Sequence, residues 1–297
     1  MDSVEKGKLK KNGKKSNKKN LNKEIQYDLD FYEYQKNAND KNILDYKNIE
    51  YLSLKEKNDF ENKFSKPRNE SQYKFLNYLK RPDSKIVIAS GPAGTGKTLF
   101  AVEEAVRNYL YDNCEKLIFT RPVVTVDEDI GYLPGTIEEK LGPFVRPLFD
   151  ILYNFIPPKE VEAMISDKII EIAPIGMLRG RTFKNSFIIA DEMQNSTISQ
   201  MKMLLTRIGE NSKLVITGDL EQNDRHGEIN GLEDFLNKIK GRRSNSINSI
   251  EFDKSDIERE KVVQEVLEIY SANNTPYNDI NKSTDNIIDN SLYVEEL

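Results

Sequence analysis

The stretch from Ile86 to Thr98 constrains the fold more than any other part of this sequence. It begins with a short apolar run, passes through a glycine-rich loop and leads into apolar residues at helical spacing. The loop fits the pattern G-x-x-x-x-G-K-[ST], with Gly91, Gly96, Lys97 and Thr98 at its fixed positions. Glycines let backbone N–H groups turn inward around an anion, and the following helix points the positive end of its dipole at the same place. The stretch therefore predicts a buried strand, a phosphate-binding loop and a helix.

The residue types of this loop predict ATP and Mg²⁺ as ligands. Lys97 has the reach and charge for the β- and γ-phosphates, and the hydroxyl of Thr98 is a ligand for Mg²⁺. The candidate nucleotide-binding residues of the loop are Gly91, Pro92, Ala93, Gly94, Thr95, Gly96, Lys97 and Thr98.

A second signal is an apolar run, 186–190, that ends in Asp191 and Glu192. Acidic residues often follow strands, but here they lie downstream of a phosphate loop, where a Walker B element is expected. Asp191 would then hold the Mg²⁺ shell, and Glu192 would orient and polarise an attacking water. We therefore expect metal ligands at Thr98 and Asp191 and a catalytic carboxylate at Glu192.

Two glutamines are further candidates, and each has a plainer alternative. Gln72 precedes the loop and carries a donor and an acceptor suited to an adenine edge, or it is a surface residue at a helix start. Gln222 follows the apolar run 213–217 and is a candidate sensor of the γ-phosphate, or it belongs to an ordinary turn.

Arg179 and Arg181 flank Gly180 after another apolar run, 169–173. Guanidinium groups match phosphate oxygens, so the pair would serve a nucleotide, a nucleic acid or a neighbouring subunit. The alternative is two solvated arginines on a turn.

Composition excludes several classes of protein. Cys114 is the only cysteine and His226 the only histidine, which excludes an internal disulfide and a zinc site built from several Cys or His ligands. We interpret Cys114 as a packing residue and His226 as a surface residue. No apolar run approaches the roughly 20 residues that span a bilayer, and no secretory signal is visible. We expect a cytoplasmic protein without membrane contact, and the net charge of −5 argues against a uniformly basic nucleic-acid binder.

The ends of the chain differ from its middle. Residues 1–23 are rich in lysine and asparagine and predict a disordered arm, which either touches nucleic acid, acts as a localisation signal or is simply solvated. We predict three parts: a largely disordered arm over 1–64, a folded domain over 65–272 and an acidic disordered tail over 273–297. Within the arm, we expect residues 24–64 to form short, weakly packed elements or to lie on the main domain.

Several separate motifs together resemble the PhoH-like P-loop ATPases, whose core is similar to the first RecA-like domain of superfamily 1 helicases. The likeness covers about residues 66–271 and rests on the phosphate loop and on the runs 120–122, 131–135, 179–182, 191–195, 200–203, 205–209 and 218–222. Two departures are Met193, where the family usually has alanine, and residues 223–225, where it usually has Asp-Leu-Pro after the glutamine segment.

The resemblance implies a three-layer α/β domain with a mostly parallel sheet, and ATP hydrolysis coupled to single-stranded RNA. It also implies a homo-oligomer, with a hexameric ring among the candidates. It favours Gln72 at adenine, Gln222 at the γ-phosphate and Arg259 at a nucleotide. Since no second RecA-like domain is visible, an arginine from a neighbouring subunit would complete the site. The candidates are Arg179, Arg181 and Arg207, with Arg181 as first choice. Two other functions stay open: a P-loop small-molecule kinase and a non-catalytic, ATP-dependent RNA-binding module.

Overall fold

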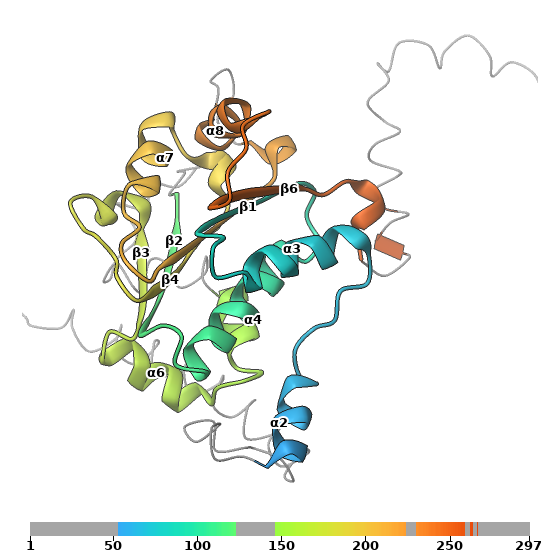
Figure 1. Cartoon of the computed structure of the whole chain (residues 1–297), viewed down its shortest axis with the longest axis vertical. Helices are drawn as coiled ribbons and strands as arrows, with labels where there is room; N and C mark the ends of the chain where they lie inside the picture. Colours follow the sequence, from blue (N-terminus) through green and yellow to red (C-terminus); the bar gives the residue numbers. More distant parts are fainter. Residues whose placement is uncertain (1–52, 123–145, 224–229, 259–261, 264–265, 267–297) are drawn as a thin grey trace, which may run out of the picture. The chain divides into compact units, whose positions relative to one another are not determined.

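The computed structural model describes residues 53–122, 146–223, 230–258, 262–263 and 266. Up to Ile257 the chain forms one compact unit, and Glu258–Leu297 form a second. The first unit contains one six-stranded, all-parallel sheet in the order β3-β2-β4-β5-β1-β6 (Figure 1). The strands are β1 (Ile86–Ser90), β2 (Lys116–Arg121), β3 (Ile170–Pro174), β4 (Ser186–Ala190), β5 (Lys213–Gly218) and β6 (Ile247–Glu251).

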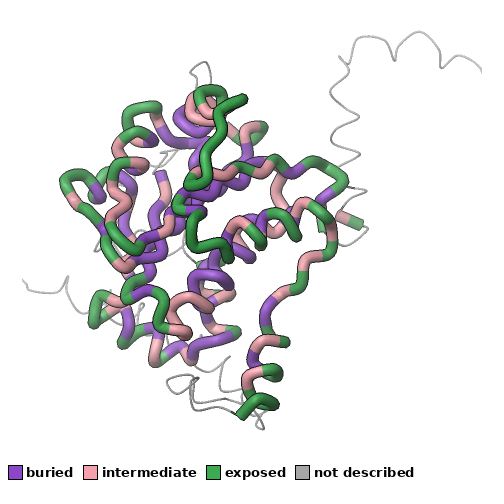
Figure 2. Tube along the Cα trace, in the orientation of Figure 1, coloured by how far each residue is buried: buried purple, intermediate pink, exposed green. Residues whose placement is uncertain are grey.

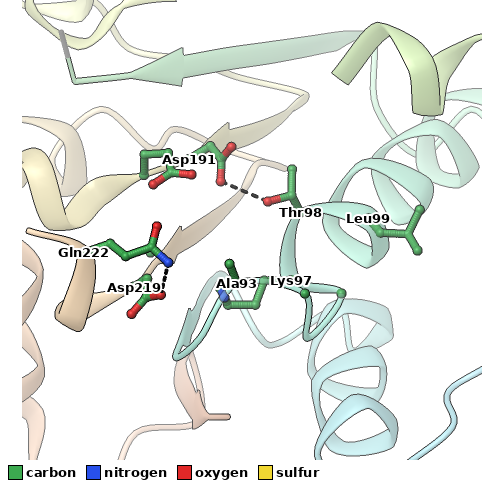
Figure 3. Close-up of a pocket in the computed structure, with 11 residues that line it drawn as sticks. Ala93, Lys97, Thr98, Leu99, Asp191, Asp219 and Gln222 are labelled. Atoms are coloured by element: carbon green, nitrogen blue, oxygen red, sulfur yellow. Dashed lines mark hydrogen bonds between the residues drawn. The ribbon is translucent and has the colours of Figure 1, made fainter. Parts of the chain in front are cut away.

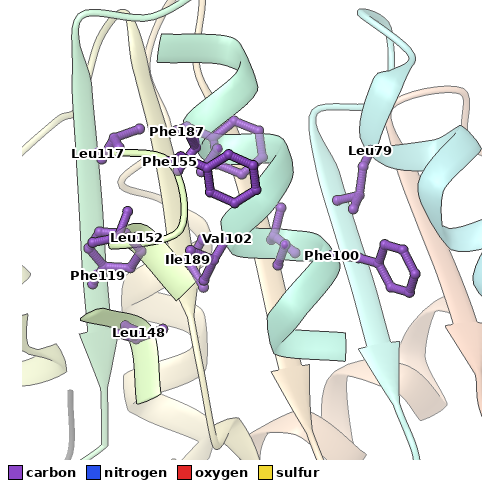
Figure 4. Close-up of a cluster of buried hydrophobic side chains, with 14 of the residues drawn as sticks. Leu79, Phe100, Val102, Leu117, Phe119, Leu148, Leu152, Phe155, Phe187 and Ile189 are labelled. Carbon is purple, nitrogen blue, oxygen red and sulfur yellow. The ribbon is translucent and has the colours of Figure 1, made fainter. Parts of the chain in front are cut away.

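Helices cover both faces of this sheet. The described α-helices are α2 (Leu54–Glu61), α3 (Glu70–Lys80), α4 (Lys97–Leu110), α6 (Pro158–Ser166), α7 (Ile198–Leu205) and α8 (Gly231–Ile239), and residues 146–152 are also helical. Buried side chains of α3, α4 and α6 form one apolar cluster with one face of the sheet (Figure 4), and those of α7 and α8 form another with the opposite face. Figure 2 colours the trace of the chain by how far each residue is buried. The expected three-layer α/β fold with a parallel sheet is therefore confirmed.

The strands read as apolar runs because both faces of the sheet are covered. Every residue of β1 and β4 is buried, and only Lys213 of β5 is not. The order of the strands places the carboxyl ends of β4, β5 and β1 next to one another. In this order β1 and β2, which follow one another in the sequence, are separated by β4 and β5. Open α/β sheets bind ligands in the crevice at the carboxyl ends of strands where the strand order reverses in this way.

The predicted strands all occur, with ends that differ by one or two residues. The run 131–135 of the family resemblance and the predicted acidic tail 273–297 lie outside the described residues. His226 and Arg259 also lie outside them. Cys114 is buried among apolar side chains, and burial raises the pKa of its thiol to about 12, as a packing role requires.

In the described part of the predicted arm, residues 53–64, the chain forms the short helix α2. Ser53 caps α2 through a capping box with Glu56. Phe60 and Phe64 are buried and contact Phe155, with the rings of Phe64 and Phe155 stacked at 4.5 Å between centroids. These rings supply enough apolar area to hold a short helix within a segment that is otherwise rich in lysine and asparagine.

Glu61 adds polar anchors to the same segment. Its carboxylate accepts hydrogen bonds from Arg107 and from the hydroxyl of Tyr111, both at the end of α4. Four residues further on, Ser65 donates both its N–H and its hydroxyl to Glu103 at 2.8 Å. Residues 53–64 therefore pack on α4.

Lys213 leads to a prediction about stability and pH. The residue begins β5, donates to the carbonyl oxygens of Leu79 and Arg81, and shares a cavity of about 630 Å³ at the amino edge of the sheet with the buried Glu104. Burial lowers the pKa of Lys213 to about 8, against about 10.4 in an unfolded chain. Between about pH 8 and about pH 10.4 the unfolded chain binds more protons than the folded chain, so the stability of the fold rises with pH. The free-energy cost of burying the charged Lys213 is therefore fully present below about pH 8 and is lost as the pH approaches about 10.4.

We expect the free energy of unfolding of Lys213→Met, relative to that of the wild type, to be higher at low pH than at high pH, because the variant lacks the buried charge. The difference between the free energies of unfolding of variant and wild type should fall by about 2–3 kcal/mol between pH 7 and pH 10.5, as urea titrations at both values would measure. The exposed Lys202→Met is the matched control, for which the difference should stay constant. An equally constant difference for Lys213→Met would contradict the prediction.

Candidate nucleotide site

The phosphate loop joins the buried strand β1 to α4, as the sequence predicts. Gly91, Gly94 and Gly96 have φ angles of 132°, 85° and 87°, which L side chains rarely adopt. A Cβ on Gly91 would lie 2.3 Å from the carbonyl oxygen of Phe252, so the residue that follows β6 also limits this position to glycine. Gly96 then stands at the N-cap of α4, whose first residue is Lys97.

Lys97 is buried inside the curve of the loop. Its Nζ donates to the carbonyl oxygens of Gly91 and Pro92, each at 2.6 Å, and contacts Oγ1 of Thr95 at 3.3 Å. Its side chain is confined by loop atoms and only 8% of the residue is exposed. The loop therefore presents a fixed positive charge at the amino end of α4, where the helix dipole also favours an anion.

A cavity of about 250 Å³ opens beside this loop (Figure 3). Its walls come from the loop and α4 and from the carboxyl ends of β4 and β5: Ala93, Gly94, Gly96, Lys97, Thr98, Leu99, Asp191, Glu192, Gly218, Asp219 and Gln222. The fold thus gathers at one place residues that lie more than a hundred positions apart in the sequence.

Asp191 faces the start of α4 across this cavity. Its Oδ1 accepts a hydrogen bond from the hydroxyl of Thr98 at 3.0 Å (Figure 3) and another from the hydroxyl of Thr217. No group of three or more His, Cys, Asp or Glu that could hold a metal occurs among the described residues. Mg²⁺ needs no such cage, because it commonly takes one or two protein oxygens together with phosphate oxygens and waters. The Thr98–Asp191 pair fits this kind of ion.

Glu192 lies at the same strand end, with its backbone in the left-handed region at φ 54°. Few non-glycine residues adopt this conformation, and such residues concentrate at functional sites. Its Oε2 accepts a hydrogen bond from Nε2 of Gln194 at 2.5 Å, and its Oε1 lies 3.5 Å from Nη2 of Arg121. The carboxylate therefore borders the cavity with a donor on each side.

Gln194 is a site residue that our sequence analysis missed. Its side chain is buried, accepts from the N–H of Asp219 at 3.0 Å and also donates to the carbonyl of Gln222 at 3.3 Å. It thus connects the end of β4 with the end of β5. The signal was its position two residues after Glu192, but its partners on β5 depend on the order of the strands.

Gln222 lines the cavity, whereas Gln72 does not and instead contacts the phosphate loop. Nε2 of Gln222 donates to Asp219 at 2.8 Å (Figure 3). Gln72 is only 3% exposed; its Nε2 donates to the carbonyl of Thr95 at 3.1 Å and its Oε1 accepts from the N–H of Arg68 at 2.8 Å. In this arrangement Gln72 braces the loop, and its contact with adenine stays a prediction.

Arg181 lies away from the residues that line the cavity. Its guanidinium forms a two-point ion pair with Glu171 of β3 and covers the ring of Phe183 at 4.6 Å. Arg207 donates to the carbonyl of Arg181 at 2.8 Å, and Arg179 is exposed. Within one chain these arginines do not reach the cavity, so a role for Arg181 across a subunit interface stays a prediction.

A parallel sheet whose β1 leads into such a loop, with paired acids at the end of β4, defines the P-loop NTPase class. Residues 65–271 match the family model described as PhoH-like protein. This chain belongs to the PhoH-like family, as the resemblance in its motifs predicted.

Curated relatives carry the same description. The PhoH-like protein of Bacillus subtilis is 41% identical over 204 residues, which cover 68% of this chain and 63% of the relative. Protein PhoH of Escherichia coli is 39% identical over 208 residues, 69% of this chain and 57% of the relative. The match thus spans about three fifths of the length of these relatives. Among solved structures, the large terminase of a thermophilic bacteriophage has a TM-score of 0.42 at 13% identity, covering 68% of this chain and 50% of the terminase.

One further finding concerns membranes. In the described ranges there is no helix with the length and apolar character needed to cross a bilayer.

Proposed function

We propose that this protein binds ATP together with Mg²⁺ and hydrolyses it. The observation that carries the proposal is the convergence of Lys97, Asp191, Glu192 and Gln222 on one cavity at the end of a phosphate loop. A cation, a metal-ligating carboxylate, a base and a polar sensor are the groups that transfer of a phosphoryl group to water requires.

Each residue has a separate task in this proposal. Lys97 exchanges its loop carbonyl partners for phosphate oxygens, and the loop N–H groups surround the same anion. Thr98 and Asp191 would hold Mg²⁺, which would supply positive charge against the phosphates. Glu192 orients a water and takes its proton, while Gln222 senses the γ-phosphate from the end of β5. The side chains that would hold the metal and the nucleotide thus already line one cavity.

Coupling to RNA and assembly into an oligomer are the further parts of the proposal. They are supported by the resemblance of the motifs to helicase-like ATPases and by the lysine-rich segment 1–23. The single, buried Cys114 supports a reducing compartment such as the cytoplasm. The mass in solution with and without ATP tests the assembly, since a ring would have a mass several times the 34.3 kDa of one chain.

The decisive experiment for the proposed reaction measures release of inorganic phosphate from Mg²⁺·ATP with no other acceptor present. Steady turnover is expected because Glu192 stands beside the cavity to activate water. A small-molecule kinase would instead release little phosphate until an acceptor is added. A non-catalytic module would bind ATP and change its affinity for single-stranded RNA without any turnover. Either of these results would overturn the proposed hydrolysis.

A further inference from the structure

Arg121 makes a contact that the proposed reaction does not use. It is the last residue of β2, which pairs with β4 so that Thr120 lies opposite Ala190. The residues just beyond this pair are neighbours too, and Nη2 of Arg121 lies 3.5 Å from Oε1 of Glu192. The strand order therefore brings a cation from β2 to the carboxylate that we assign as the base.

Arg121 contacts Glu192 from outside the cavity. Glu192 lines the cavity, whereas Arg121 does not. The other carboxylate oxygen is taken by Gln194 at 2.5 Å, which is itself bound to the end of β5. A base that activates water needs a carboxylate oxygen turned towards the attacked phosphate. Here one oxygen of Glu192 accepts a hydrogen bond from Gln194, and the other faces Arg121 in an ion pair.

We propose that Arg121 is a positioning residue that holds Glu192 in a resting orientation and so restrains turnover until the ion pair opens. The inference rests on the proposed function, because it concerns the same carboxylate. The pair is built to open: its contact is long, and about a third of each side chain is exposed, 33% for Arg121 and 34% for Glu192. Ion pairs this exposed are weak, so the restraint is modest and reversible.

The test compares Arg121→Gln with the wild type at saturating Mg²⁺·ATP. Glutamine keeps a polar side chain without the charge, so the turnover number should rise about two- to fivefold while KM stays within about twofold, because Arg121 lies outside the cavity. Arg121→Lys keeps the charge and should return the turnover number to that of the wild type. Arg81→Gln removes an exposed arginine paired with Asp83 at the opposite edge of the sheet and should change neither value.

A measurement without turnover tests the contact itself. The Nε–H signal of Arg121 in an NMR spectrum, assigned by its loss in Arg121→Lys, should shift in Glu192→Gln, while the signal of Arg81 should not. Unchanged or lowered turnover in Arg121→Gln, in an otherwise active protein, would overturn this inference and leave the proposed function standing. Absence of phosphate release from the wild type would instead overturn the proposed function.

Discussion

Replacing Glu192 with glutamine is expected to lower the turnover of ATP by about 10²- to 10⁴-fold, the usual contribution of a positioned general base. The amide keeps the shape and one acceptor oxygen but cannot take a proton from water. Glu192 borders the cavity without belonging to the phosphate loop, so the affinity for ATP should persist. Single-turnover kinetics together with titration of a fluorescent ATP analogue would separate the two effects.

The matched control for this variant is Glu221→Gln. Glu221 is exposed, lies next to Gln222 and is not among the residues that line the cavity, so the same chemical change there should leave turnover within about twofold. Equal turnover in Glu192→Gln and the wild type would mean that another group activates the water.

Replacing Lys97 with alanine is expected to abolish tight binding of ATP. The ammonium group is buried in the loop, 2.6 Å from two carbonyl oxygens, and is the charge that faces the phosphates. Removing one partner of a buried charge pair costs about 2–5 kcal/mol, which corresponds to roughly a 30- to 4,000-fold loss of affinity. Calorimetric titration with a non-hydrolysable ATP analogue would measure this loss.

The fold should survive the change, because Lys97 contacts the loop and not the apolar core. A circular dichroism spectrum and a melting temperature close to those of the wild type would establish this. Lys74→Ala, which removes an exposed lysine paired with Glu70, is the control and should bind ATP normally. Affinity retained by Lys97→Ala would remove the loop from the proposed nucleotide site.

The sheet and the loop could be predicted from the sequence because their signals are local. Buried parallel strands such as β1 and β4 read as continuous apolar runs, and the loop motif is contained in eight consecutive residues. The roles expected for Asp191 and Glu192 followed from their position after such a run.

The contacts around Glu192 could not be predicted in this way. Whether Arg121 lies beside Glu192 depends on the pairing of β2 with β4, and no local pattern encodes the order of strands. The same reason hides the bonds from Gln194 to the end of β5. For residues 53–64 short elements were expected, but their packing could not be predicted, because Phe60 and Phe64 are isolated in a polar segment and their partner Phe155 is about 90 residues away.

The place of β1 between β5 and β6 has a consequence for how the protein is made. Ile86 pairs with Leu214 and with Ile247, which lie about 130 and 160 residues further along the chain. At a synthesis rate of about 5–20 residues per second, the phosphate loop leaves the ribosome on the order of 10 s before either neighbour of its strand. A nascent chain that ends before β5 holds the loop sequence but neither Thr217 beside Asp191 nor Phe252 against Gly91. We therefore expect the proposed nucleotide binding to be a late event in folding, so that ATP would stabilise only chains in which β5 and β6 have already been synthesised.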